Sequence, residues 1–247
     1  PNNLASYLLI VLPLQVWVLV RGLRPWRATV LGVGLIAETA ALMRTDTRIV
    51  WVTLIAVLLI ILVLTGGRRV GVVGWLVLAG VMGVWGWQGW AATAGGLRLD
   101  PGRVEGWSIA WAMFRDAPMW GVGLGTYMHN YLGYPLLDGA WPRPQYAHNC
   151  YLQILAEGGL LGLGTFLALL SWVAATVVRS LWMRLGASDG LLPGLAAALA
   201  GLLVNVGFDT GLYSVPMASM FWFLLGLAAG MATRPQTANH WAHSPSG

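Results

Sequence analysis

The sequence predicts an all-α membrane protein, a polytopic bundle of about seven transmembrane helices. Hydrophobic residues fill 57% of the 247 positions and charged residues only 9%, whereas about 25% of the residues in a typical soluble domain are charged. The mean hydropathy is +0.69. Several apolar runs approach the ~20 residues that a helix needs to cross a bilayer. Because backbone polar groups in lipid must bond to each other, these runs are expected to be helices.

The apolar segments lie at about residues 4–20, 28–43, 49–64, 70–90, 159–178, 191–208 and 214–232. Two of them, 28–43 and 49–64, are short for a span, which implies tilt or burial within the bundle. Residues 1–232 are expected to form a single transmembrane domain, and the polar segment 233–247 a disordered cytoplasmic tail. The chain begins at Pro1 and is already hydrophobic at Leu4, so we expect an N-terminally trimmed chain.

The distribution of arginine predicts the orientation of the bundle. If the segments alternate, one side receives the arginines at positions 21, 24, 27, 68, 69, 179, 184 and 234. Short loops rich in basic residues face the cytoplasm. The opposite, periplasmic side then carries the long loop 91–158 and the turn at 209–211. The 14 basic residues, all arginine, give a pI of about 9.9, which we attribute to topology and phosphate or lipid ligands, not to nucleic acid.

The loop 91–158 is the unusual feature of this topology, because long connections between membrane helices tend to be functional. Within it, residues 103–116 predict an amphipathic helix that Pro118 prevents from continuing. Its apolar face is expected to carry Trp107, Ala110, Trp111 and Phe114. Arg103, Glu105 and Arg115 are expected to lie away from that face. Such a helix should lie in the plane of the membrane interface, with its tryptophans at headgroup depth.

His148 is the first candidate for chemistry. It stands directly before an apolar helix that is expected to start near Cys150, with Asn149 as its N-cap. An imidazole can accept a proton near neutral pH and therefore suits a general base for a hydroxyl nucleophile. The alternative is an interfacial histidine that bonds only to backbone or to lipid headgroups.

Arg48 and Arg103 are predicted on the same side as His148. A guanidinium binds phosphate oxygens through paired N–H donors and keeps its charge, so two of them could hold a diphosphate and stabilise it as it leaves. The alternatives are a snorkelling Arg48 at a helix end and a local ion pair for Arg103. Arg44 competes with Arg48 for the same role.

Three acidic residues complete the candidate set. Glu157 and Asp209 lie near helix ends on the side of His148, where a carboxylate could orient His148 or an arginine, or could merely cap a helix. Glu38 lies inside segment 28–43. An acid at that depth is costly, and an arginine is its expected partner.

No cofactor and no metal site are predicted. The single Cys150 and the four histidines form no metal-binding pattern. The glycine-rich segment Gly121–Gly125 does not follow a strand and therefore is not a dinucleotide fingerprint. It is expected to form a tight loop.

Three segments together resemble the family of O-antigen ligases and O-antigen polymerases. The segment from Asp116 to Tyr127, DAPMWGVGLGTY, is similar to the family's "d-P-l-x-G-v-G-x-g-x-f" stretch. The segment from Ala147 to Gly162, AHNCYLQILAEGGLLG, is similar to "H-N-x-y-L-x-x-l-x-E-x-G-l-l-G". Gly102–Trp107, GRVEGW, is similar to "s-g-R-x-x-x-W". The resemblance extends over about residues 40–232, the C-terminal half of a typical member.

This resemblance implies a metal-independent, inverting glycosyltransferase in the bacterial inner membrane. It would move a glycan from an undecaprenyl-diphosphate carrier to a hydroxyl of lipid A-core or another acceptor, on the periplasmic side. The family's histidine corresponds to His148 and its loop arginine to Arg103. A second arginine, in a "t-x-S-R-g" segment, corresponds by position to Arg48 in TDTRI, where Thr47 and Ile49 depart from the pattern.

Other functions stay open at this point. A repeat-unit polymerase or a protein O-oligosaccharyltransferase shares the same motifs. A transporter or flippase subunit is the non-enzyme alternative, although the inverted repeats that would favour it are not evident. The chain could also be inactive without the N-terminal half of a full-length member.

Overall fold

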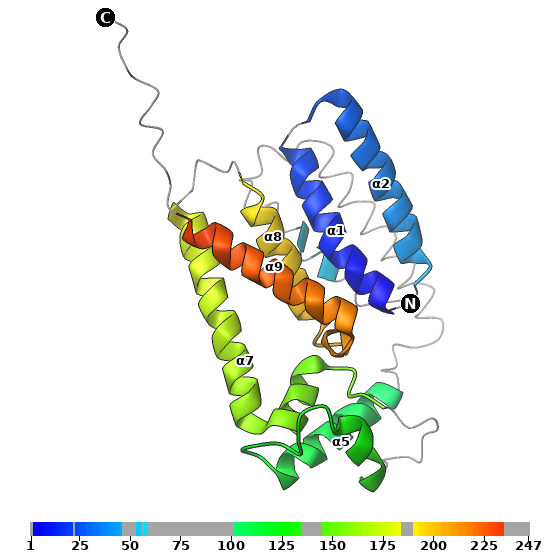
Figure 1. Cartoon of the computed structure of the whole chain (residues 1–247). Coiled ribbons are helices and arrows are strands. Elements are labelled where there is room, and N and C mark those ends of the chain that lie inside the picture. The colour runs from blue at the N-terminus through cyan, green and yellow to red at the C-terminus, as the bar shows by residue number, and fades with distance from the viewer. Residues whose placement is uncertain are drawn as a thin grey trace, which may run out of the picture.

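The computed structural model describes residues 2–21, 23–45, 53–55, 57–58, 101–134, 145–183 and 190–234, and every regular element in these ranges is a helix. The all-helical prediction is therefore confirmed for this part of the chain. Figure 1 shows two regions along the long helix α7, a bundle around its C-terminal part and a smaller group of helices at its N-terminal end. The second region, residues 101–134 and 145–158, is called the cap.

Five helices form the bundle: α1 (Asn2–Val20), α2 (Pro25–Met43), α7 (Cys150–Met183), α8 (Leu192–Asn205) and α9 (Val215–Thr233). Each matches one predicted apolar segment. Of these, α2, α7 and α9 are long and apolar enough to cross a membrane, while α1 and α8 are shorter apolar helices. The predicted segment 70–90 and most of 49–64 lie outside the described residues, so the total of about seven spans stays a prediction.

Helices α1 and α8 pack closely and run antiparallel. Trp17, near the end of α1, donates its indole N–H to the carbonyl of Gly190, just before α8, at 3.0 Å. At the opposite ends, the buried Asn205 donates to the Ser6 hydroxyl at 2.9 Å. A Cβ on Gly194 would lie only 2.7 Å from the Trp17 side chain. Small residues and interhelical hydrogen bonds of this kind hold helices together where lipid removes the hydrophobic driving force.

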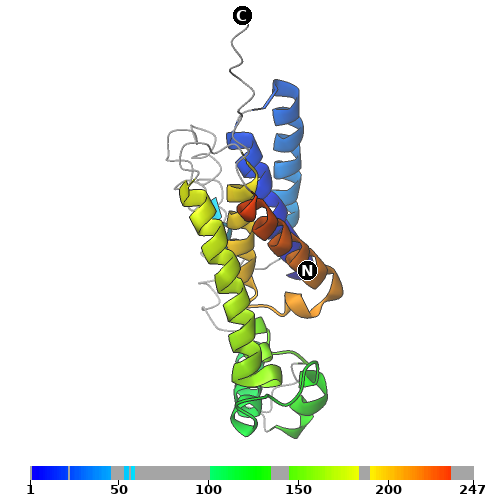
Figure 2. The ribbon, with the colours of Figure 1, turned by 60° about the vertical axis from the view of Figure 1, so that its left-hand side comes forward.

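Arg21, Arg179 and Arg234, three of the arginines expected to face the cytoplasm, lie at one end of this bundle. Arg21 donates to the Gly190 carbonyl at 2.9 Å, which places the α1–α2 connection beside the start of α8. The C-terminal ends of α7 and α9 lie at the same end in Figures 1 and 2, and the cap lies at the other. Arg179 and Arg234 belong to those two C-terminal ends.

The cap consists of α5 (Pro101–Asp116), the glycine-rich loop 117–126, α6 (Tyr127–Asn130), the short η1 (Tyr131–Gly133) and the first turns of α7. Helix α5 ends two residues before Pro118, as predicted. Its buried face differs from the prediction, however, because it consists of Glu105, Gly106, Ile109, Ala110 and Met113. Trp111 is exposed, and Glu105, expected on the polar side, is buried. The buried face differs because α5 packs against residues 146–147 and α7, and the interfacial position of this helix stays a prediction.

Helix α7 is interrupted at Gly159, whose φ of 63° and ψ of −161° are not helical. The glycine-rich loop fits into this interruption through backbone hydrogen bonds in both directions. Val122 and Gly123 donate to the carbonyls of Ala156 and Glu157 at 2.9 and 3.0 Å. Leu160 donates in return to the carbonyl of Pro118 at 2.8 Å. We call this contact the glycine interlock.

Two glycines make the glycine interlock possible. A Cβ on Gly121 would lie 2.2 Å from the Glu157 carbonyl carbon, and one on Gly159 would lie 2.4 Å from that of Met119. Both residues also have positive φ, which L side chains adopt only at a cost. The loop can therefore approach α7 this closely only with glycine at both positions.

Gly121→Ala is expected to destabilise the chain far more than Gly125→Ala. The two glycines have nearly the same φ, 69° and 72°, but a Cβ at Gly125 meets nothing within 4 Å. Gly125→Ala should therefore lower the free energy of unfolding by only about 1–2 kcal/mol, the strain of a positive φ. Gly121→Ala should lower it further, because the new Cβ would also clash with the backbone of Glu157. The measurement is the temperature at which half of the purified protein in detergent loses its monodisperse state. Equal losses for the two variants would contradict the interlock.

Candidate active site

The segment Gln145–Asn149 leads into α7 and carries His148 in a conformation that side chains rarely adopt. Its φ of 49° makes it the non-glycine residue with positive φ among those described. Such conformations cost free energy and persist where the surroundings enforce them, often at functional sites. Asn149 caps α7 as predicted, because its Oδ1 accepts the Leu152 N–H at 3.0 Å.

Helix α5 lies directly against this segment. A Cβ on Gly106 would lie 2.9 Å from the Tyr146 carbonyl oxygen and 3.2 Å from the Ala147 Cα. Arg103 is one helical turn before Gly106, so it belongs to the same side of α5. Because Gly106 has no side chain, the backbone of residues 146–147, just before His148, can lie close to α5, the helix that carries Arg103.

The connection between α8 and α9 borders both residues. Arg103 donates from Nη1 to the Phe208 carbonyl at 2.6 Å. Cys150, two residues after His148, donates its N–H to the Val206 carbonyl at 2.8 Å. The α8–α9 connection therefore contacts two segments that are far from it in the sequence. Arg103 of α5 bonds to Phe208, and the start of α7 bonds to Val206.

Asp209 belongs to this connection, where two of its oxygens accept hydrogen bonds. Its Oδ1 accepts the N–H of its neighbour Thr210 at 2.8 Å, and its carbonyl accepts the Cys150 thiol at 3.2 Å. Asp209 thus shapes the connection on which Arg103 rests.

Glu157 is 2% exposed and gathers donors from three elements. Its Oε2 accepts the Gly125 N–H and the Tyr213 hydroxyl, each at 2.9 Å. Its Oε1 accepts the Tyr127 N–H at 3.0 Å. A buried carboxylate is stable when several donors surround it. This carboxylate is therefore held by hydrogen bonds from the glycine-rich loop, α6 and η2 (Gly211–Tyr213).

Gln153 connects Glu157 to the segment that carries His148, and the sequence analysis missed it. Its Nε2 lies 3.5 Å from Oε1 of Glu157, and its Oε1 accepts the Ala147 N–H at 3.2 Å. The side chain is 1% exposed. A signal was present, because Gln153 and Glu157 are four residues apart on one helical face of an otherwise apolar segment. The pair fixes the backbone immediately before His148.

Two tyrosines extend the same network. The Tyr127 hydroxyl donates to the Gly106 carbonyl at 2.9 Å, which connects α5 to the start of α6. Burial raises the pKa of Tyr127, and the charges of Glu105 and Glu157 raise it further. Burial and the adjacent Glu157 likewise raise the pKa of Tyr213. Both hydroxyls therefore stay protonated and remain donors at any ordinary pH.

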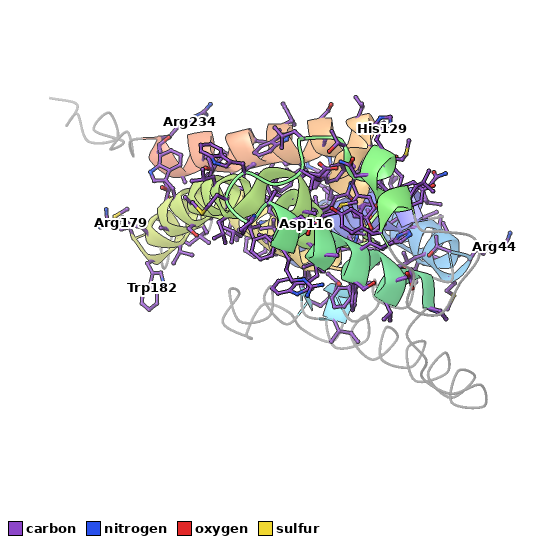
Figure 3. All side chains as sticks on the ribbon, turned by 90° about the horizontal axis from the view of Figure 1, so that it is seen from below. Arg44, Asp116, His129, Arg179, Trp182 and Arg234 are labelled. Carbon is purple, nitrogen blue, oxygen red and sulfur yellow. The ribbon has the colours of Figure 1, made fainter. Side chains whose placement is uncertain are left out.

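The remaining candidates lie elsewhere. Arg48 is outside the described residues. Arg44 is exposed at the end of α2 and lies at the outer edge of the view in Figure 3. The prediction of an arginine partner for Glu38 is not met in the described contacts, because its Oε1 accepts the Gln15 amide at 2.6 Å. Gly34 leaves room for the Gln15 side chain there. Among the described residues, no group of His, Cys, Asp and Glu could hold a metal ion.

Comparison with known proteins agrees with the resemblance found in the sequence. A family model described as O-antigen ligase matches residues 31–167, more than half of the chain. The match includes α5, the glycine-rich loop, His148 and Glu157. No curated protein sequence matches the chain. Together with the membrane-length helices, the match identifies an integral membrane protein.

Glu157→Gln is expected to lower stability by about 2–3 kcal/mol, because an amide NH₂ would face the donors that the carboxylate accepts. Tyr213→Phe removes only one of those donors, so it should cost about 1 kcal/mol. Thermal unfolding of both variants in the same detergent tests whether Glu157→Gln lowers stability more than Tyr213→Phe does. A Glu157→Gln protein as stable as the parent would show that the buried carboxylate does not hold the cap together.

Proposed function

Because the chain belongs to the O-antigen ligase family, we propose that it is a glycosyltransferase that moves a glycan from undecaprenyl diphosphate to an acceptor hydroxyl. The observation that supports this proposal is that Arg103 and Cys150, which follows the strained His148 by two residues, both donate to carbonyls of residues 206–208. The acceptor class, whether lipid A-core, a growing glycan or a protein, is left to the experiment below.

The proposed reaction is a direct displacement with inversion at the sugar. His148 removes the proton of the acceptor hydroxyl as its oxygen forms a bond to the anomeric carbon. The bond from that carbon to the diphosphate oxygen breaks, and the electron pair leaves with undecaprenyl diphosphate. Arg103, and Arg48 by its predicted position, bind the diphosphate and stabilise the charge that develops on it. No cofactor takes part in this scheme.

The proposed location is the bacterial plasma membrane, with the cap on the extracytoplasmic side. The arginines at the opposite end of the bundle support this orientation, since short basic connections stay in the cytoplasm. A cap outside the cytoplasm has no access to nucleotide sugars, which favours a lipid-linked donor. The prenyl chain of that donor would lie among or beside the helices in lipid.

The decisive experiment supplies the purified protein with an undecaprenyl-diphosphate-linked glycan and one acceptor at a time. We expect release of undecaprenyl diphosphate that depends on one acceptor, and that acceptor identifies ligase, polymerase or protein transferase. Movement of intact donor across a vesicle bilayer without its consumption would favour a transporter and overturn the proposal.

His148→Ala is expected to reduce turnover by roughly 100-fold or more, the usual contribution of a general base. The matched control is His129→Ala, because His129 is a histidine of the same cap with an exposed side chain on α6. Initial rates of undecaprenyl diphosphate release measure both variants. A folded His148→Ala protein with the activity of the parent would exclude His148 as the base.

Arg103→Gln is expected to raise KM for the donor and to lower kcat, because the diphosphate loses a charged fork of N–H donors. Arg103→Lys should recover part of kcat, since a lysine keeps the charge but not the fork. Arg115→Gln is the matched control, as Arg115 is an exposed arginine at the end of the same helix. Steady-state kinetics over a range of donor concentrations separates the two parameters. Similar effects of the substitutions at 103 and 115 would argue against a diphosphate site at Arg103.

A further inference from the structure

The outer side of the glycine-rich loop carries large apolar side chains that nothing in the described structure covers. Trp120 is 77% exposed and Leu124 is 80% exposed, and Met119 beside them is also exposed. The loop backbone is nevertheless held firmly by the glycine interlock. An exposed apolar group on a rigid support marks an interaction surface.

This surface continues onto the exposed apolar side of α7. Leu160 and Leu161 are exposed at the start of the C-terminal part of α7, and their N–H groups donate to the carbonyls of Pro118 and Met119 at 2.8 and 3.3 Å. Leu124 lies against the same point, since a Cβ on Gly158 would be 3.6 Å from its Cδ2. The loop therefore lies level with the residues at which the long apolar part of α7 begins.

The length of α7 indicates how deep in a bilayer the glycine-rich loop would lie. Gly159 and the exposed Arg179 are 20 residues apart in one helix, which corresponds to about 30 Å at 1.5 Å per residue. The hydrocarbon core of a bilayer is also about 30 Å thick. If Arg179 lies at the headgroups of one leaflet, as a basic residue prefers, Gly159 and the loop lie at the headgroups of the other.

We propose that Trp120 and Leu124 form a membrane anchor, seated in the lipid of the leaflet on the side of His148. Tryptophan favours the boundary between headgroups and acyl chains, and leucine gains free energy from transfer out of water. Continuity with the apolar side of α7 favours lipid over a partner protein as the occupant. The anchor is independent of the proposed glycosyl transfer, because it depends only on the position of the loop relative to the bilayer.

Spin labels test the anchor in the full chain, reconstituted in phosphatidylcholine–phosphatidylglycerol vesicles. The single native thiol, Cys150, is fully buried, so nitroxides attach to the introduced cysteines of Leu124→Cys and Trp120→Cys. The matched control is His129→Cys, on the exposed side of α6, away from Arg179 and Arg234 in Figure 3. The unsubstituted chain gives the background labelling.

Relaxation by oxygen, which concentrates in lipid, is compared with relaxation by a water-soluble nickel chelate. For labels at positions 120 and 124 we expect an oxygen-to-nickel ratio several-fold higher than at position 129. A ratio equal to that at position 129 would place the loop in water and overturn the proposal. Low accessibility to both reagents would also overturn it, because a protein surface would then cover the loop. Both side chains are exposed, so neither substitution removes a core contact.

Discussion

The cap depends on backbone hydrogen bonds between two chain segments that approach without side chains between them. An interruption in α7 exposes backbone groups that a continuous helix would satisfy internally. The glycine-rich loop supplies the missing partners, through Val122 and Gly123 in one direction and through Pro118 in the other. Glu157, next to the interruption, strengthens this contact because it also accepts the N–H groups of Gly125 in the loop and Tyr127 at the start of α6.

The network around Glu157 explains how a strained residue is kept at the end of a membrane helix. A φ of 49° at His148 has to be enforced by its neighbours. Gln153 accepts the N–H of Ala147, and Glu157 holds Gln153. Asn149 caps the helix on the other side of His148. The backbone on both sides of the histidine is therefore fixed by groups that belong to the interrupted helix itself.

The sequence predicted the parts of this structure that depend on local pattern. Apolar runs located the five bundle helices, and Pro118 located the end of α5, because both effects act within a few residues. The prediction of the buried face of α5 was wrong. That face depends on the contact of Gly106 with Tyr146 and Ala147, which are about 40 positions away in the sequence. The periodicity of the helix itself contains no information about such a contact. Glu157 was expected near the site, but its donors come from segments 30 to 56 residues away. Gln153 was missed although its partners, Ala147 and Glu157, are only six and four residues away.

With the proposed membrane anchor, the interlock also couples the depth of the proposed site to the membrane. The loop that enters the interruption in α7 carries Trp120 and Leu124 outward, and its inner side holds Glu157 and thereby Gln153. A lipid-linked diphosphate lies at headgroup depth, because its prenyl chain is in the acyl region while its charges need water or protein donors. A rigid element that contacts the interface on one side and fixes the backbone before His148 on the other would hold the base at the depth where the reacting bond must be. A flexibly attached cap would not keep His148 at the depth of the reacting bond. Misplacement of a catalytic group by about 1 Å can lower the rate roughly 100-fold.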